Sequence, residues 1–267
     1  MFHSLLLNIR LFFRGAVLSY IALFRWFTPP AYLASKVIAP LSYMLFFVVL
    51  GTFATGKESA SFYIIGNSVQ MAAMSGIYGV TMSIGGDRWD GTLPYLFATP
   101  ANRLALFVGR AAIHVLDGIL GVFLGLFWGI TLLGLDVSKT DPLVLSVVIL
   151  ITTFSTSGFG LLLGALSLLT RNIMFVNNTV FFLLLIFSGA NLNLSLLPEW
   201  MQTISWSLPL TRGIASARKI ISGSAFIEIA PLMGTEFLIG VLYILLGFLL
   251  FRWFEFKAKR KGTLEVM

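Results

Sequence analysis

Cysteine is absent from this 267-residue sequence, and histidine occurs only twice, at His3 and His114. Without a thiol the chain can form no disulfide, no thiolate metal site and no cysteine nucleophile. Two imidazoles are too few for a histidine-rich metal centre. The sequence also contains no GxxxxGK[ST] loop, no dinucleotide fingerprint and no arguable Ser/His/Asp set. We therefore predict no catalytic residues, no metal site and no cofactor site in this chain.

Charged side chains are scarce as well, at 11% of residues, whereas 58% are hydrophobic and the mean hydropathy is +0.93. Apolar runs of about 18 residues or more indicate membrane-spanning helices. Runs this continuous exclude a membrane β-barrel. We predict an all-α integral membrane protein without a separate soluble domain, and with six spans: Leu33–Phe53, Phe62–Ile84, Leu106–Leu133, Leu143–Leu169, Ile173–Ala190 and Leu232–Phe254.

The 18 basic residues are distributed unevenly around these spans. Lysine and arginine collect in cytoplasmic loops, so the more basic side is predicted to be cytoplasmic, with both termini on it. The net charge of +7 then reports topology and attraction to anionic lipid, and no nucleic-acid partner is expected. The less basic side holds five residues, Lys57, Lys139, Arg212, Arg218 and Lys219. The other side holds thirteen: Arg10, Arg14, Arg25, Lys36, Arg88, Arg103, Arg110, Arg171, Arg252, Lys257, Lys259, Arg260 and Lys261.

The first 31 residues are predicted to form an amphipathic helix in the cytoplasmic interface, ended by Pro29-Pro30. A short tilted span is the alternative. The helical apolar stripe consists of Leu5, Ile9, Phe12, Ala16, Tyr20, Leu23 and Phe27.

Three other regions interrupt or flank the predicted transmembrane domain, residues 32–256. A polar segment, residues 85–100, must project into water because its charges are costly in hydrocarbon. Residues 191–231 are too apolar for an ordinary loop and too rich in proline to span, which predicts two short helices dipping into the outer leaflet. Residues 257–267 are predicted to be a basic cytoplasmic tail.

Small residues recur every fourth position in the third and fourth predicted spans. They predict close helix–helix packing, because small side chains let helix backbones approach in a membrane. The two motifs are Gly121-xxx-Gly125-xxx-Gly129 and Thr156-xxx-Gly160-xxx-Gly164.

His114 and Asp117 lie three residues apart on one face of the third span, with Arg110 one turn before His114. We predict a structural role in which Asp117 pairs with Arg110 or with neighbouring helices. A proton relay is the alternative, although a relay normally needs further carboxylates in the bundle. Asn177, Asn178 and Thr179, early in the fifth span, are likewise interpreted as packing groups rather than as part of a passage.

Together these features resemble the permease subunits of type 2 ABC exporters, which include drug-export and polysaccharide-export permeases. One match is Asp87-Arg88-Trp89-Asp90-Gly91-Thr92-Leu93 followed by Thr99-Pro100, similar to the family's acidic-Arg-x-acidic-Gly-Thr-Leu…Thr-Pro pattern. The other is Phe187-Ser188-Gly189, Leu197-Pro198-x-Trp200, Pro209-Leu210-Thr211 and Arg218. The sequence departs from the pattern where aspartate replaces glutamate at 87 and 90, and where Ser207-Leu208 precedes Pro209 in place of Asn-Pro.

The resemblance implies a coupling helix at residues 87–99 that docks on a separate ABC ATPase subunit. Its implied contacts are Asp87, Arg88, Asp90, Gly91, Thr92, Leu93, Leu96 and Phe97. From the helical spacing, Leu93, Leu96 and Phe97 are expected to offer an apolar face to that partner. Pro198, Trp200, Pro209 and Thr211 are implied to belong to an extracellular gate or re-entrant region.

The resemblance further implies a bacterial or archaeal cytoplasmic membrane, a second permease copy in a homodimer, and ATP and Mg²⁺ bound by the partner. An ion-coupled secondary carrier, or a signalling or assembly subunit, remains an alternative. The cargo is open between a drug, a peptide, a lipid and a lipid-linked glycan.

Overall fold

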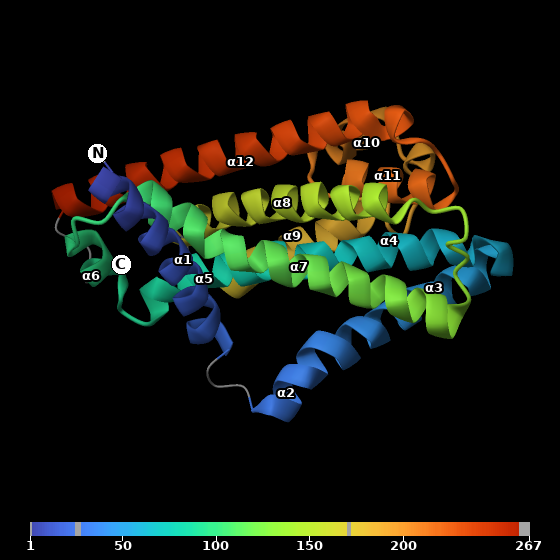
Figure 1. The fold of residues 1–267 in the computed structure, drawn as a ribbon, viewed down its shortest axis with the longest axis horizontal. Coiled ribbons are helices and arrows are strands. Elements are labelled where there is room, and N and C mark those ends of the chain that lie inside the picture. The colour runs from blue at the N-terminus through green and yellow to red at the C-terminus, as the bar shows by residue number, and fades with distance from the viewer. Residues whose placement is uncertain (1, 25–27, 170–171, 262–267) are drawn as a thin grey trace.

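The computed structural model describes residues 2–24, 28–169 and 172–261, and within these ranges every regular element is a helix. The predicted all-α class is therefore confirmed. The long helices run lengthwise through an elongated bundle (Figure 1). Two basic residues in the predicted charge asymmetry, Arg25 and Arg171, lie outside the described residues, as does the tail beyond residue 261.

Four helices are long and apolar enough to cross a membrane, so the chain is a multi-pass membrane protein. They are Pro29–Thr55, Arg103–Leu133, Pro142–Ser167 and Phe226–Arg260. The first is built from α2 (Pro29–Leu33), a π-helical segment η1 (Ala34–Ile38) and α3 (Ala39–Thr55), and the others are α7 (Arg103–Leu133), α8 (Pro142–Ser167) and α12 (Phe226–Lys261). They correspond to the first, third, fourth and sixth predicted spans.

Two side chains set where α7 and α8 begin. The Asn102 side chain accepts hydrogen bonds from the backbone amides of Leu104 and Ala105, at 3.0 and 3.2 Å. Asp141 caps α8 in the same way, with Pro142 in the first turn. Gly134 ends α7 at a φ of +68°, a left-handed conformation that glycine adopts without steric cost.

The other two predicted spans have a different character. Residues 60–89 form an unbroken helical run of α4 (Ala60–Ala73), the π-helical segment η3 (Met74–Gly79) and α5 (Val80–Trp89). This run buries Asn67, Ser68 and Gln70, which lowers its apolar character. Helix α9 (Ile173–Phe187) has 15 residues, fewer than the ~20 that a perpendicular crossing needs. The count of six spans therefore stays a prediction.

Both small-residue motifs lie where helices pack closely, as predicted. A Cβ atom on Gly125 would lie 2.9 Å from the Cα of Ser68, so the α7 motif packs against α4. A Cβ on Gly160 would overlap the carbonyl oxygen of Gly76 in η3, and one on Gly164 would lie 2.8 Å from Ile84 in α5. The backbones approach closely because these positions carry no side chain.

Helix α1 (Phe2–Phe24) packs against α7 and is absent from the four candidate spans. Part of the predicted stripe makes this contact: Ala16 is buried, and a Cβ on Gly109 would lie 2.8 Å from the carbonyl oxygen of Phe12. The description of α1 as a helix with a single apolar stripe is too simple, however, because apolar side chains outside the stripe are exposed as well. They are Phe13, Val17, Leu18 and Ile21.

The two ends of the bundle carry different elements (Figure 1). At one end lie α1, α6 (Leu93–Ala98) and the last turns of α12. At the other end lie the turn between α3 and α4, the connection between α7 and α8, and α11 (Thr211–Ile221). Two short helices, α10 (Glu199–Ser207) and α11, occupy the region predicted to hold them, after a 3₁₀ turn at Leu194–Leu196. Much of α11 is buried against α4, α8 and α12.

Candidate functional site

The segment predicted as one coupling helix, residues 87–99, is two helices joined by a tight turn. Helix α5 ends at Trp89, and α6 starts at Leu93. Gly91 has a φ of +65°, which glycine adopts readily, and the amide of Thr92 donates to the carbonyl oxygen of Asp87 at 2.9 Å. The single helix expected from the resemblance is wrong, because this left-handed residue interrupts it.

The apolar face of α6 is already occupied within the chain. The side chains of Leu93 and Phe97 are only 5% and 3% exposed. The ring of Phe97 lies 5.8 Å from that of Phe251 and 6.3 Å from that of Phe254, both on α12. The expectation that Leu93 and Phe97 face a partner protein is therefore wrong, and Leu96 is half-buried beside them. An amphipathic six-residue helix cannot by itself indicate whether its own chain or another covers its apolar face.

Two of the charges in the segment also have partners within the chain. Asp87 forms an ion pair with Arg110 of α7, and the hydroxyl of Thr92 donates to the Asp87 carboxylate at 2.9 Å. Arg88 donates to the carbonyl oxygen of Leu168 at 2.9 Å, just beyond α8. These contacts tie the turn to α7 and α8, so its position depends on how those helices are placed.

Arg103 and Glu255 hold α6 in place, a role that was not predicted for either residue from the sequence. Arg103 donates to the carbonyl oxygens of Phe97 and Thr99, at 3.0 and 2.8 Å, at the C-terminal end of α6. Its Nε atom lies 2.8 Å from Glu255 on α12. Glu255, which is 3% exposed, also pairs with Arg252 and Lys259 at 2.6 and 2.8 Å. A single glutamate among the basic residues that end α12 is the signal that could have identified this cluster.

The tip of the hairpin is one of the exposed surfaces at this end of the bundle. Asp90, Gly91 and Thr92 in the turn are exposed, and the side chain of Tyr95 is 76% exposed on the outer side of α6. We call this surface, Asp90–Thr92 together with Tyr95, the hairpin tip. It combines one carboxylate, two hydroxyls and one aromatic ring on a turn that is held in place by the contacts above, which suits contact with another protein.

A second cluster surrounds Asp117, in the middle of α7. Asp117 forms an ion pair with Lys36 of η1 and accepts hydrogen bonds from Ser75 of η3 at 2.5 Å and from Tyr20 of α1 at 3.2 Å. Pairing of Asp117 with neighbouring helices is therefore confirmed, whereas pairing with Arg110 is wrong because Arg110 binds Asp87. One carboxylate thus joins α1, α7 and two π-helical segments, a helix form often found at functional sites.

His114 lies beside this cluster: its backbone carbonyl accepts a 3.0 Å hydrogen bond from Ser75, and its ring lies 6.0 Å from that of Tyr20. Its side chain is buried against Gly79, and neither ring nitrogen has a hydrogen-bond partner among the described residues. The side chain amide of Asn177 is buried in the same unpartnered way, within the described part of α9. The side chain of Asn178 instead accepts a hydrogen bond of 2.5 Å from the hydroxyl of Tyr78, and this hydrogen bond is exposed. No contact in the described residues links these groups into a relay.

The region between α9 and α12 contains a third buried carboxylate. Glu236 is 0% exposed and accepts a 2.8 Å hydrogen bond from the backbone amide of Leu210, whose φ of +85° is unusual for a residue other than glycine. Glu236 is close to the start of the predicted sixth span, Leu232–Phe254, whereas α12 begins ten residues before Glu236, at Phe226. Glu236 therefore stabilises the strained start of α11 from inside the bundle.

The four residues expected in a gate have contrasting environments. Thr211 is buried, and its hydroxyl lies 3.5 Å from the carbonyl oxygen of Phe187. Trp200 on α10 is 63% exposed, and Pro198 precedes that helix. Pro209 lies in the link between α10 and α11. Among the described residues, no group of three or more histidine, aspartate or glutamate side chains could hold a metal ion.

Comparison with known proteins agrees with this architecture. The family model described as "ABC-2 type transporter" matches residues 15–222. A curated relative from Streptomyces coeruleorubidus, "Daunorubicin resistance ABC transporter permease protein DrrB1", is 28% identical over 205 residues, which cover 73% of this chain and 70% of the relative. The matched region includes the hairpin tip, the Asp117 cluster and the two short helices before α12.

Proposed function

Because this chain belongs to the ABC-2 type transporter family and is a membrane subunit of an ABC transporter, we propose that it forms an ATP-driven exporter as a homodimer with two separate ATPase subunits. The observation that carries the proposal is a family match over residues 15–222 in a chain whose sequence has no phosphate-binding loop. The permease dimer supplies the path, and the ATPase subunits bind ATP and Mg²⁺. The membrane is the cytoplasmic membrane of a bacterium or archaeon.

In this proposal the chain crosses the membrane six times with both termini in the cytoplasm. The run of residues 60–89 and helix α9 are the two additional crossings, and α1 lies in the cytoplasmic interface. The arrangement of the bundle supports this orientation. Helix α1, which carries Arg10 and Arg14, and the basic end of α12 lie at the α6 end (Figure 1). The α3–α4 turn, which contains Lys57, and the α7–α8 connection, which contains Lys139, lie at the other end.

The ATPase contact is proposed to be the hairpin tip rather than the apolar face of α6. The exposed ring of Tyr95 enters a groove on the ATPase, and Asp90 and Thr92 set the register at its rim. Movement of the ATPase then reaches the transmembrane helices through the ties of Asp87 to Arg110 and of Arg103 to Glu255. The buried residues Leu93 and Phe97 keep α6 fixed to α12.

The cargo is proposed to be an amphipathic small molecule, since the curated relative is named for resistance to a drug. The exposed apolar faces of α3 and α9 support a path between two copies of the chain. An apolar face on a membrane helix meets either lipid or another helix, and in this proposal a second copy covers these two faces in part. The exposed side chains include Phe46, Val49 and Phe53 on α3, and Phe175, Phe182 and Ile186 on α9.

The first test is co-purification of the permease with its ATPase, followed by vanadate-sensitive ATP hydrolysis and cargo uptake in vesicles. The pure permease is expected to hydrolyse no ATP, and robust hydrolysis by it alone would refute the proposal. Vanadate-insensitive transport driven by a proton gradient would favour an ion-coupled carrier. An active complex that moves no cargo would favour a signalling or assembly subunit.

The second test compares two substitutions of Tyr95. Tyr95→Asp is expected to weaken ATPase binding by about tenfold or more, because it places a carboxylate against an apolar groove. Tyr95→Phe keeps the ring and serves as the matched control. Leu93→Asp is a poor probe, since Leu93 is buried and its change lowers stability instead. ATPase recovery with Tyr95→Asp at the level of Tyr95→Phe would remove the hairpin tip as the contact.

A further inference from the structure

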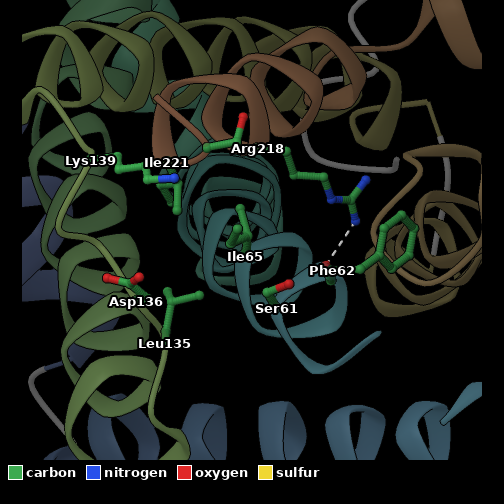
Figure 2. A pocket seen from close by; sticks show the side chains of 9 residues that line it. Ser61, Phe62, Ile65, Leu135, Asp136, Lys139, Arg218 and Ile221 are labelled. Carbon is green, nitrogen blue, oxygen red and sulfur yellow. Dashed lines mark hydrogen bonds between the residues drawn. The ribbon is translucent and has the colours of Figure 1, made fainter. Parts of the chain in front are cut away.

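A cavity of about 490 Å³ lies at the end of the bundle opposite α6. Three segments that are distant in sequence form its walls: the start of α4, the connection between α7 and α8, and the end of α11 (Figure 2). Its volume falls within the range of ~300–1,000 Å³ typical of small-ligand sites. The lining residues are Ser61, Phe62, Ile65, Leu135, Asp136, Lys139, Arg218, Ile221 and Ser222.

Arg218 is a fixed cation in the wall of this cavity. Its Nη2 atom donates to the carbonyl oxygens of Phe62 and Ala190, at 3.0 and 3.1 Å, and its guanidinium carbon lies 3.5 Å from the centre of the Phe62 ring. Both acceptors are neutral, and among the described residues no carboxylate forms an ion pair with Arg218. Its Nε atom is buried without a hydrogen-bond partner there. Arg218 as a whole is half-buried. An arginine withdrawn from water usually has an anionic partner, and the described residues supply none here.

A second cation faces the cavity from the connection between α7 and α8. Lys139 is exposed, and Figure 2 shows its side chain extending toward Ile221, on the same side of the cavity as Asp136. The Asp136 carboxylate accepts a hydrogen bond of 2.9 Å from the backbone amide of Ser138, which lowers its pKa and keeps it ionised. Two cations and one carboxylate therefore leave the lining with an excess of one positive charge.

The rest of the lining is largely apolar. Ile65 lies at the centre of the view in Figure 2, with Leu135, Ile221 and Phe62 around it. A bare anion would leave these side chains without contacts. A molecule that joins an anionic group to an apolar body would fill both parts of the cavity, because such sites combine apolar walls with a few polar groups that orient the ligand.

We propose that this cavity binds the phosphate group of an amphiphile, with the phosphate against Arg218 and Lys139 and the apolar part against Ile65 and Ile221. A phospholipid headgroup and a free phosphate ester share this chemistry. The binding site itself is independent of the proposed exporter function. Only its placement at the outer leaflet follows from the orientation proposed above.

The test uses the delipidated full-length protein in detergent, with lipid retention measured by native mass spectrometry. Phosphatidylglycerol is expected to bind, and Lys139→Gln is expected to weaken its binding by about tenfold, since a charged hydrogen-bond donor is lost. Ser222→Glu, which adds a negative charge to the lining, is expected to have a similar effect. Lys219→Gln is the matched control, because Lys219 is exposed on α11 but does not line the cavity.

Glycerol phosphate then distinguishes the two sources of the phosphate. Full competition by glycerol phosphate at millimolar concentration would show that the phosphate group alone fills the site, and would overturn the role of the apolar lining. The absence of competition would assign the site to the whole lipid. Equal loss of phosphatidylglycerol in Lys139→Gln and Lys219→Gln would overturn the proposal, because it would indicate attraction to overall surface charge. Unchanged binding in both Lys139→Gln and Ser222→Glu would overturn it as well.

Discussion

Replacing Asp117 by asparagine removes one charge from the group that joins α1, η1, η3 and α7, while it keeps the size of the side chain. Asparagine can still accept a hydrogen bond from Ser75 or Tyr20, but it leaves the ammonium group of Lys36 without its anion. The Asp117 side chain is 9% exposed, whereas that of Lys36 is 26% exposed, so water can hydrate the lysine in part. We therefore expect the loss of stability to come from the missing charge and not from a change in packing.

Breaking a buried ion pair by removing one partner costs about 3–5 kcal/mol, and the partial exposure of Lys36 reduces this to about 2–4 kcal/mol in the free energy of unfolding. Thermal unfolding of the purified protein in detergent measures the effect. Asp141→Asn is the matched control: Asp141 caps α8 at the surface, and asparagine caps a helix as well as aspartate does, so a change below about 0.5 kcal/mol is expected.

A double variant that combines Asp117→Asn with Lys36→Gln isolates the interaction between Lys36 and Asp117. If the two side chains interact as the structure shows, the effects of the single changes should fail to add by about 1 kcal/mol or more. Strict additivity would refute the ion pair as the source of the loss. The pH dependence of transport, corrected for protein level, should stay unchanged in Asp117→Asn. Loss of a proton-driven activity at unchanged protein level would instead support a relay.

Three further predictions concern other parts of the chain. Cysteine introduced at Lys139 should react with an impermeant label from outside intact cells, whereas cysteine at Asp90 should react only after permeabilisation. Glu236→Gln should retain the acceptor for the amide of Leu210 and fold with little loss, whereas Glu236→Leu should lower the melting temperature and the yield. Gly160→Val should prevent folding because its side chain would overlap the backbone of η3. Gly86→Ala, where a Cβ meets nothing within 4 Å, should be tolerated.

Each of these three predictions has an outcome that would contradict it. External labelling at position 90 would reverse the orientation and remove the hairpin tip from the cytoplasm. Equal stability of the two Glu236 variants would mean that the strained start of α11 does not depend on that hydrogen bond. Normal yield of Gly160→Val would show that α8 and η3 are farther apart than the structure places them.

The amino-acid sequence alone was enough to identify an all-helical, multi-pass membrane protein and to predict where its helices pack most closely. Whether a helix can cross a membrane depends on the apolar residues of one continuous segment. A long apolar run such as that in α12 therefore predicts a membrane helix without reference to the rest of the chain. The glycine spacing around Gly125 and Gly160 is equally local, because it describes one face of one helix. The motifs around residues 87–100 and 187–218 were enough to indicate the family.

The partner that each polar or apolar face contacts became clear from the folded structure and not from the sequence. Phe97 packs on α12 rather than on another protein, and Asp87 pairs with Arg110 while Asp117 pairs with Lys36. The partners of Asp87 and Asp117 could not be read from spacing, because they depend on the order, rotation and depth of helices that are distant in sequence. The same applies to Glu236 and Arg218. Their surroundings exist only once α11 is folded back into the bundle, which is a property of the assembled helices and not of any one of them.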